Sequence, residues 1–251
     1  MHTSLSGSIE KQGNWLFKHR GYLPLLSLPF ITLAIRNAEI HESVKGETLE
    51  LWNEFIGLGI AFLGLAIRCY VIGTVPAGTS GRVTASQEAA TLNVTGMYSI
   101  VRHPLYLGNY IIVMGMAVFI GTWWLPLIST VLFWPYYERI AFAEEAFLQK
   151  RFGNRFSEWT KHTPAFLPRF HSWQPPSLKF SWRTVLRREY GAFLAIIVIC
   201  SLSEICGDLF FDPRPHLEKG WVVVLIVGTF IALTLRTLKR KSKLLNVEGR
   251  P

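Results

Sequence analysis

The sequence predicts an all-α fold, a polytopic transmembrane bundle of about six helices. Half of the 251 residues are hydrophobic and 14% are aromatic, and the apolar residues form long runs. Lys and Arg give a net charge of +9, but they cluster in short blocks between these runs. That distribution is typical of a polytopic membrane protein and not of a nucleic-acid groove, so we expect a bilayer around the chain and no nucleic-acid partner.

The three cysteines and the first residues exclude two further classes. Cys69, Cys200 and Cys206 lie in apolar runs and form no Cys-x-x-Cys pair, so we expect neither a disulfide framework nor a metal site. The first dozen residues are polar, and the first apolar run begins only after Arg20. We therefore expect no cleavable secretory signal.

The first two predicted spans are residues 22–35 and 51–73. The first is short and carries two prolines, which predict a kinked crossing. The second is apolar throughout, apart from Arg68 near its inner end, whose long side chain we expect to reach the membrane interface. Its three glycines, at positions 57, 59 and 64, predict a small-residue face for close helix contact.

A helical hairpin is predicted next, formed by spans 105–124 and 125–137. The uncharged residues 121–124 connect them, and a polar loop over residues 74–97 precedes them. The fourth span is short, so we expect its helix to leave the bilayer and to end at Gly153, a residue type that commonly follows a helix.

Two more spans, 190–211 and 221–238, follow a basic, proline-punctuated segment over residues 154–176 that predicts a short interfacial helix and a linker. Glu204 and Asp208 lie one turn apart on the fifth span. They are candidates for an ion-binding face or for a polar contact between helices.

Charge segregation predicts the topology. With six spans, 20 of the 26 Lys and Arg residues fall on one side, which the positive-inside rule assigns to the cytoplasm together with both termini. The expected location is a bacterial cytoplasmic membrane. The predicted regions are a two-span N-terminal part (1–91), a core (92–170) and a C-terminal two-span part (171–251).

The first chemistry-bearing motif is Arg102-His103-Pro104-Leu-Tyr106-Leu-Gly108. Pro104 suits the first position of a helix, because its missing N–H would have no partner there. Arg102 and His103 are charged or titratable, and Tyr106 combines an apolar ring with a polar tip. Gly108 allows a ligand or a backbone to come close. A basic interfacial anchor is the alternative interpretation.

A second motif lies on the cytoplasmic extension of the fourth span and contains Arg139, Glu144 and Glu145. Neighbouring residues on a helix point about 100° apart, so the two carboxylates cannot both contact one atom. At least one of them is expected to face a binding site. A solvated acidic turn that balances nearby basic residues is the alternative.

Together, the two motifs resemble those of the isoprenylcysteine carboxyl methyltransferase family of integral-membrane methyltransferases, which also includes phospholipid methyltransferases. The similarity covers the elements at 102–108 and 144–153 and the prolines at 164 and 168, within residues 92–170. It implies S-adenosylmethionine as the cofactor, held in a cytoplasmic pocket over the hairpin. It also implies a lipid or another lipophilic molecule as the methyl acceptor.

The resemblance, together with residue chemistry, gives roles to individual residues. Glu145 is expected to bind the cationic end of the cofactor and Arg139 an anionic acceptor. Glu144 is expected to orient Arg139 or to line the acceptor entry. The expected cofactor site comprises Arg102, His103, Pro104, Tyr106, Gly108 and Glu145, and the expected catalytic residues are Arg139 and Glu144.

Other functions stay open at this point. A sterol-reductase-like enzyme that uses NADPH has a similar scaffold, and a transporter would use Glu204 and Asp208 for ion binding. The sequence also leaves the acceptor open among a prenylcysteine carboxylate, a lipid phosphate, a phospholipid amine and a thiol.

Overall fold

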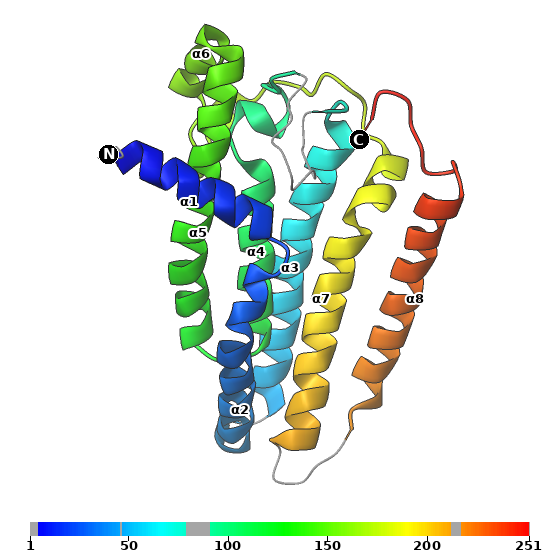
Figure 1. Cartoon of the computed structure of the whole chain (residues 1–251). Helices are drawn as coiled ribbons and strands as arrows, with labels where there is room; N and C mark the ends of the chain where they lie inside the picture. Colours follow the sequence, from blue (N-terminus) through cyan, green and yellow to red (C-terminus); the bar gives the residue numbers. More distant parts are fainter. Residues whose placement is uncertain (1–4, 46, 79–90, 212–216, 251) are drawn as a thin grey trace.

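The computed structural model describes residues 5–45, 47–78, 91–211 and 217–250, and within them it confirms a helical bundle without strands (Figure 1). Parts of the predicted loop 74–97 and of the connection after the fifth span lie outside these residues. The α-helices are α1 (Leu5–His19), α2 (Leu28–Lys45), α3 (Glu47–Thr74), α4 (Pro104–Phe119), α5 (Trp124–Phe152), α6 (Asn154–His162), α7 (Trp182–Phe210) and α8 (Lys219–Lys241). Short 3₁₀ turns occupy Leu23–Ser27, Met97–Ser99 and Phe170–Ser172.

Four described segments are long and apolar enough to cross a membrane, namely Leu23–Ile40, Glu50–Thr74, Trp182–Phe210 and Lys219–Lys241. They correspond to the first, second, fifth and sixth predicted spans. The third corresponds to α4, which has only 16 residues, and the fourth to the first part of α5. A crossing by this hairpin therefore stays a prediction.

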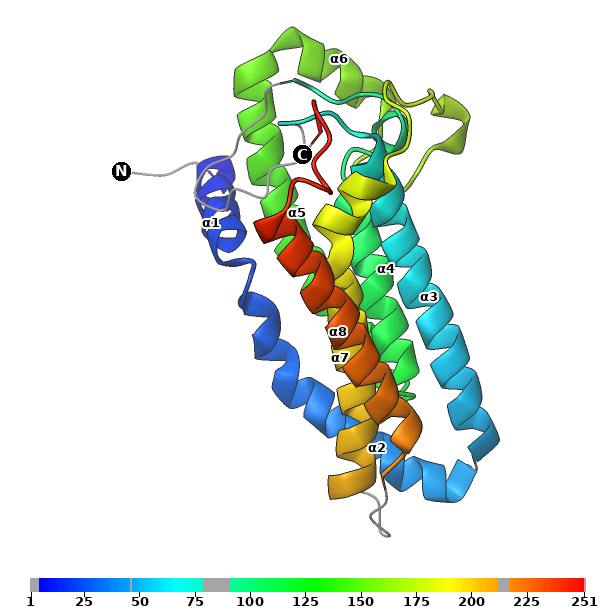
Figure 2. The same ribbon diagram turned by 90° about the vertical axis from the view of Figure 1, so that its right-hand side faces the viewer.

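The long helices run side by side, while α1 lies across α5 at a steep angle (Figures 1 and 2). The sequence analysis did not predict α1. It packs so tightly that a Cβ on Gly13 would lie 2.1 Å from the carbonyl oxygen of Arg139. The ends of α1 and α5, together with α6 and the C-terminus, gather at one end of the bundle (Figure 1).

The contact between α3 and α4 depends on small residues. A Cβ on Gly64 would lie 2.7 Å from the Gly108 carbonyl oxygen, and one on Gly115 would lie 2.3 Å from the Ala61 nitrogen. Gly57 also belongs to this contact, as predicted, but Gly59 faces open space and the prediction for it was wrong. The two backbones can approach this closely because no side chain separates them.

Helix α7 begins eight residues before the predicted span. The Ser181 hydroxyl accepts a hydrogen bond from the Thr184 backbone N–H at 3.4 Å, which caps the helix. Residues 182–189, which include three arginines and Glu189, thus form the first two turns of a helix. Two other expected helix limits are confirmed, since α4 begins at Pro104 and α5 ends just before Gly153, which has φ +52°.

Candidate active site

The Arg-His-Pro motif lies in a turn that leads from buried backbone into α4. Ile100 and Val101 are fully buried, and His103 is the residue before the helix. The segment after α6 holds this turn, because Arg102 N–H donates to the Pro164 carbonyl oxygen at 2.9 Å. The turn therefore has a fixed position at the end of the bundle where α5 extends past it.

Both motifs meet across α4 and α5. The Arg102 guanidinium donates to Glu145 Oε2 at 2.7 Å, and His103 Nε2 lies 2.8 Å from Glu145 Oε1. The Tyr106 hydroxyl donates to Glu144 Oε1 at 2.6 Å. His103 also lies between the two carboxylates, with Nδ1 3.8 Å from Glu144 Oε2. The structure thus brings together five of the residues that the sequence singled out.

The two glutamates face different surroundings, as their positions on the helix require. Glu144 lines a cavity, whereas Glu145 is held by Arg102 and His103. Glu145 was expected to take the cofactor's cationic end. In this structure it has two cationic or titratable partners from the protein, and Glu144 is the carboxylate that faces the cavity.

The cavity has a volume of about 620 Å³, within the range of small-molecule sites. Its lining includes residues 91–93 and parts of α3, α4, α5 and α7, together with Phe17, Arg20, Gly21, Tyr98 and Trp159. It therefore takes side chains from all three predicted regions.

Charged and aromatic groups dominate the lining. The arginines are Arg20, Arg68, Arg102 and Arg188, and the carboxylates are Glu144 and Glu189. Arg102 Nε is buried and has no hydrogen-bond partner in the described part of the chain. The rings are those of Phe17, Tyr98, Tyr106, Tyr137, Phe147 and Trp159.

Burial changes the ionisation of two groups outside the spans. It raises the pKa of the Glu144 carboxyl above the ordinary value of 4.5, and His103, the Tyr106 hydroxyl and Arg20 offset only part of this shift. Burial and the nearby Glu144 also raise the pKa of Tyr98. A positive charge in the cavity would therefore stabilise the ionised form of Glu144.

The expectation for Arg68 was wrong, because its side chain turns into the protein and not to the interface. Its guanidinium donates to both oxygens of Glu189, at 2.7 Å and 3.0 Å, and to Asn109 Oδ1 at 2.5 Å. Glu189 is only 3% exposed. The predicted fifth span begins at residue 190, just after this glutamate. The position of Arg68 within an apolar run is the sequence feature from which a buried acidic partner could have been predicted.

The remaining candidates lie outside the cavity lining. The Arg139 guanidinium donates to Gln12 Oε1 of α1 at 2.9 Å and to the Pro135 carbonyl oxygen at 3.0 Å. Pro104 is buried at the start of α4. Gly108 lies against Arg68, where an added Cβ would come within 2.6 Å of Cγ. Gly108 therefore lets the Arg68 side chain pass over α4.

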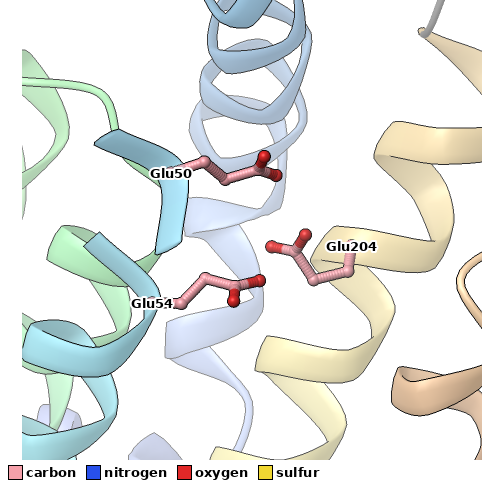
Figure 3. A group of neighbouring side chains, drawn as sticks. All are labelled: Glu50, Glu54 and Glu204. Atoms are coloured by element: carbon pink, nitrogen blue, oxygen red, sulfur yellow. The ribbon is translucent and has the colours of Figure 1, made fainter. Parts of the chain in front are cut away.

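Glu204 and Asp208 of α7 lie toward the other end of the bundle. Oxygens of Glu204, Glu50 and Glu54 lie within 4.8 Å of one another (Figure 3). Asp208 instead accepts a hydrogen bond from the Glu218 backbone N–H at 2.9 Å, just before α8. The two candidates for an ion-binding face thus have different surroundings.

Comparisons with known proteins find similarity to membrane methyltransferases. The family model for phospholipid methyltransferases matches residues 52–155. The Schizosaccharomyces pombe protein-S-isoprenylcysteine O-methyltransferase is 29% identical over 112 residues, which cover 44% of this chain and 48% of that protein. The Arabidopsis thaliana protein-S-isoprenylcysteine O-methyltransferase B is 29% identical over 119 residues, or 47% of this chain and 60% of that one.

A third relative carries a different name. The nickel-cobalt-cadmium resistance protein NccN of Alcaligenes xylosoxydans xylosoxydans is 31% identical over 85 residues, or 34% of this chain and 39% of that protein. The alignments thus span between about two fifths and three fifths of these relatives. No solved structure matches. Less than half of the chain, residues 52–155, thus matches the phospholipid methyltransferase family model, and parts of the chain are similar to isoprenylcysteine O-methyltransferases.

Proposed function

We propose that the protein transfers a methyl group from S-adenosylmethionine to a lipophilic acceptor. The observation that carries the proposal is the cavity at the junction of the two motifs, where a buried carboxylate, several arginines and six aromatic rings converge. Two curated relatives are named as O-methyltransferases of isoprenylcysteine. An acceptor of this kind would enter from the bilayer that surrounds the helices.

The lining suits the chemical groups of S-adenosylmethionine. The sulfonium and the ammonium are cations, and Glu144 offers a carboxylate to a positive charge. The cofactor's carboxylate suits Arg102, whose Nε lacks a partner in the described chain. Adenine suits the rings of Tyr98, Tyr106 or Trp159. When bound, the cofactor supplies an electrophilic methyl group on a positively charged sulfur.

The chain's own residues would bind and orient, because this transfer needs no proton to move when the acceptor is an oxyanion. A lone pair of the acceptor oxygen forms the C–O bond, and the electrons of the broken S–C bond stay on sulfur. Glu145 would act through Arg102 and His103, which it holds in place. Positioning and exclusion of water would supply most of the rate.

The proposal is tested first by ligand binding to the purified protein and then by methyl transfer. We expect S-adenosylhomocysteine, and not NADPH, to raise the melting temperature of the purified protein. We also expect transfer of labelled methyl from S-adenosylmethionine into a total lipid extract. Stabilisation by NADPH alone would instead support a reductase, and stabilisation by neither ligand would contradict both enzymes.

A further inference from the structure

Four polar side chains from four helices line one wall of the cavity and form a continuous chain of hydrogen bonds. They are Glu189 of α7, Arg68 of α3, Asn109 of α4 and Tyr137 of α5. Arg68 donates to Glu189 and to Asn109 Oδ1, and Asn109 Nδ2 donates to the Tyr137 hydroxyl oxygen at 2.9 Å. We call this chain the relay.

The direction of every bond in the relay is fixed. A guanidinium only donates hydrogen bonds, so the Asn109 atom that faces Arg68 must be the oxygen. The Asn109 amide nitrogen must then face Tyr137, and it too can only donate. The Tyr137 hydroxyl oxygen is therefore an acceptor within the relay, which leaves its own hydrogen for another partner.

Asn109 is the one hydrogen-bond partner of the Tyr137 hydroxyl within the residues that the structure describes. The ring is held by its neighbours, with Phe133 stacked at 4.1 Å and Tyr106 at 4.7 Å between centroids. The Tyr106 hydroxyl differs, because it already donates to Glu144. Tyr137 thus offers an oriented O–H donor to a molecule in the cavity.

Arg68 contributes further hydrogen-bond donors to this side of the cavity. Its bonds to Glu189 and Asn109 use three of its five N–H groups. The bidentate pair with the buried Glu189 fixes the plane of the guanidinium. Glu189 lies outside the segment that matches the family model, so α7 contributes the anchor of the relay.

We propose that the relay directs the Tyr137 O–H to an anionic oxygen of the methyl acceptor, so that the protein methylates a lipophilic oxyacid and not an amine. This inference rests on the proposed function. The ammonium form of an amine carries donors only, and the hydrogens that the relay leaves for a ligand are those of the Tyr137 hydroxyl and of Arg68. Both oxygens of its one carboxylate, Glu189, already accept from Arg68, and Glu144 is assigned to the cofactor. A carboxylate or a phosphate has one oxygen to accept from Tyr137 and another to attack the methyl group. Glu189, Arg68 and Asn109 are then positioning residues.

Two substitutions separate this role from a merely structural one. Tyr137→Phe removes the donor. Asn109→Asp keeps an acceptor for Arg68 but makes the Tyr137 hydroxyl donate to the new carboxylate, which turns the hydrogen away from the acceptor. The matched control is Tyr110→Phe on the same hairpin, since the Tyr110 hydroxyl contacts Thr130 at 3.1 Å and lies outside the cavity.

The experiment measures methyl transfer to three probes, which are N-acetyl-S-farnesylcysteine (a carboxylate), phosphatidic acid (a phosphate) and phosphatidylethanolamine (an amine). We expect the parent protein to label the carboxylate or the phosphate probe, and the two arms distinguish these oxyacids. Tyr137→Phe and Asn109→Asp should each raise the KM for the labelled probe about ten- to a hundredfold. The Kd for S-adenosylhomocysteine should stay within about twofold, and the control should match the parent in both quantities.

Three results would overturn the inference. The parent protein could methylate the amine probe, or it could bind S-adenosylhomocysteine and methylate neither oxyacid probe. The third result is a KM of Tyr137→Phe that equals that of the parent. Weaker binding of S-adenosylhomocysteine in both variants would assign the Tyr137 hydroxyl to the cofactor instead. A parent that binds no S-adenosylhomocysteine would contradict the proposed function itself.

Discussion

Glu144 and Glu145 are adjacent in the chain but differ in electrostatic surroundings. Glu145 has the Arg102 guanidinium and the His103 ring within 2.8 Å. Glu144 has the neutral Tyr106 hydroxyl at 2.6 Å, and its His103 contact is longer, at 3.8 Å. Desolvation therefore outweighs charge compensation at Glu144 and raises its pKa. The protein keeps a carboxylate in the cavity whose charge is only partly balanced.

This imbalance predicts a pH-dependent stability. A carboxyl whose pKa is higher in the folded than in the unfolded chain contributes stability below its unfolded pKa, and the contribution is lost as the pH rises through the folded pKa. Glu144→Gln removes this titration. We expect the melting temperature of Glu144→Gln, relative to the parent, to increase as the pH is raised from about 5 to 8 in the absence of cofactor.

The control for this measurement is Glu158→Gln. Glu158 is exposed, and the hydrogen bond from Lys161 lowers its pKa, so its contribution has the opposite sign and is screened by solvent. A difference between Glu144→Gln and the parent that is constant or decreases with pH would contradict the assigned environment of Glu144.

At the scale of elements, α1 and α5 form a unit that borders the cavity. Gln12 receives a hydrogen bond from Arg139, Glu10 pairs with Lys150 at 2.6 Å, and Gly13 lets the two helices touch. Phe17 near the end of α1, and Arg20 and Gly21 just after it, line the cavity. Arg139 is thus connected to the cavity through α1.

We expect Arg139→Ala to impair methyl transfer through the position of α1 and to leave the Kd for S-adenosylhomocysteine nearly unchanged. Gln12→Ala removes the partner and keeps the arginine, so it should reproduce a large part of the loss in kcat/KM for the lipid acceptor. Full activity of Gln12→Ala beside an inactive Arg139→Ala would instead support the direct contact between Arg139 and an anionic acceptor that the sequence suggested.

The contact between α3 and α4 predicts a strong position dependence for small substitutions. Gly115→Ala adds a methyl group where the Ala61 nitrogen lies only 2.3 Å away, so the two helices must separate. We expect a loss of about 1–3 kcal/mol in stability, which is typical of overpacking. Gly59→Ala is the matched control, because nothing lies within 4 Å of its added Cβ. Equal melting temperatures for the two variants would contradict the packing.

Most of the helices, and half of the site, could be predicted from local patterns in the sequence. Pro104 and Gly153 mark helix ends by their own backbone preferences, so both limits were predictable. The pairing of the two motifs followed from their resemblance to a known family. Arg68 and Glu189 are 121 residues apart, and nothing local in the chain indicates that they meet. Likewise, α1 is a short polar helix whose stability comes from its contact with α5 and not from its own sequence.

At the scale of the whole molecule, the cavity depends on segments on both sides of the family-matched region. Residues 17–21 precede this region, and Glu189 and Ala192 of α7 follow it. The C-terminal segment strengthens the same end, because the Arg250 guanidinium donates to the Gly73 carbonyl oxygen at 2.7 Å and also to that of Lys179. The N-terminal helix, α7 and the C-terminal segment therefore belong to the site's architecture.

The α4–α5 hairpin decides whether the chain crosses the membrane six times. With 16 residues, α4 is about 24 Å long, which is less than the hydrocarbon core of about 30 Å. The hairpin turn carries Trp123, which is 77% exposed, and tryptophan is typical of the membrane interface. A bilayer that thins locally around the hairpin would accommodate the short helix at modest cost. We therefore expect the turn to reach the outer surface.

Cysteine labelling in intact cells tests this topology. The native cysteines lie in α3 and α7, and each is buried or partly buried. We expect a membrane-impermeant maleimide to label Trp123→Cys from outside the cell. Glu158→Cys on α6 and Glu248→Cys near the C-terminus, both at exposed positions at the cavity end, should react only after permeabilisation, since that end carries most of the Lys and Arg residues. Labelling of Trp123→Cys only after permeabilisation, together with Glu158→Cys, would show that the hairpin turns back within the bilayer and that the protein has four crossings.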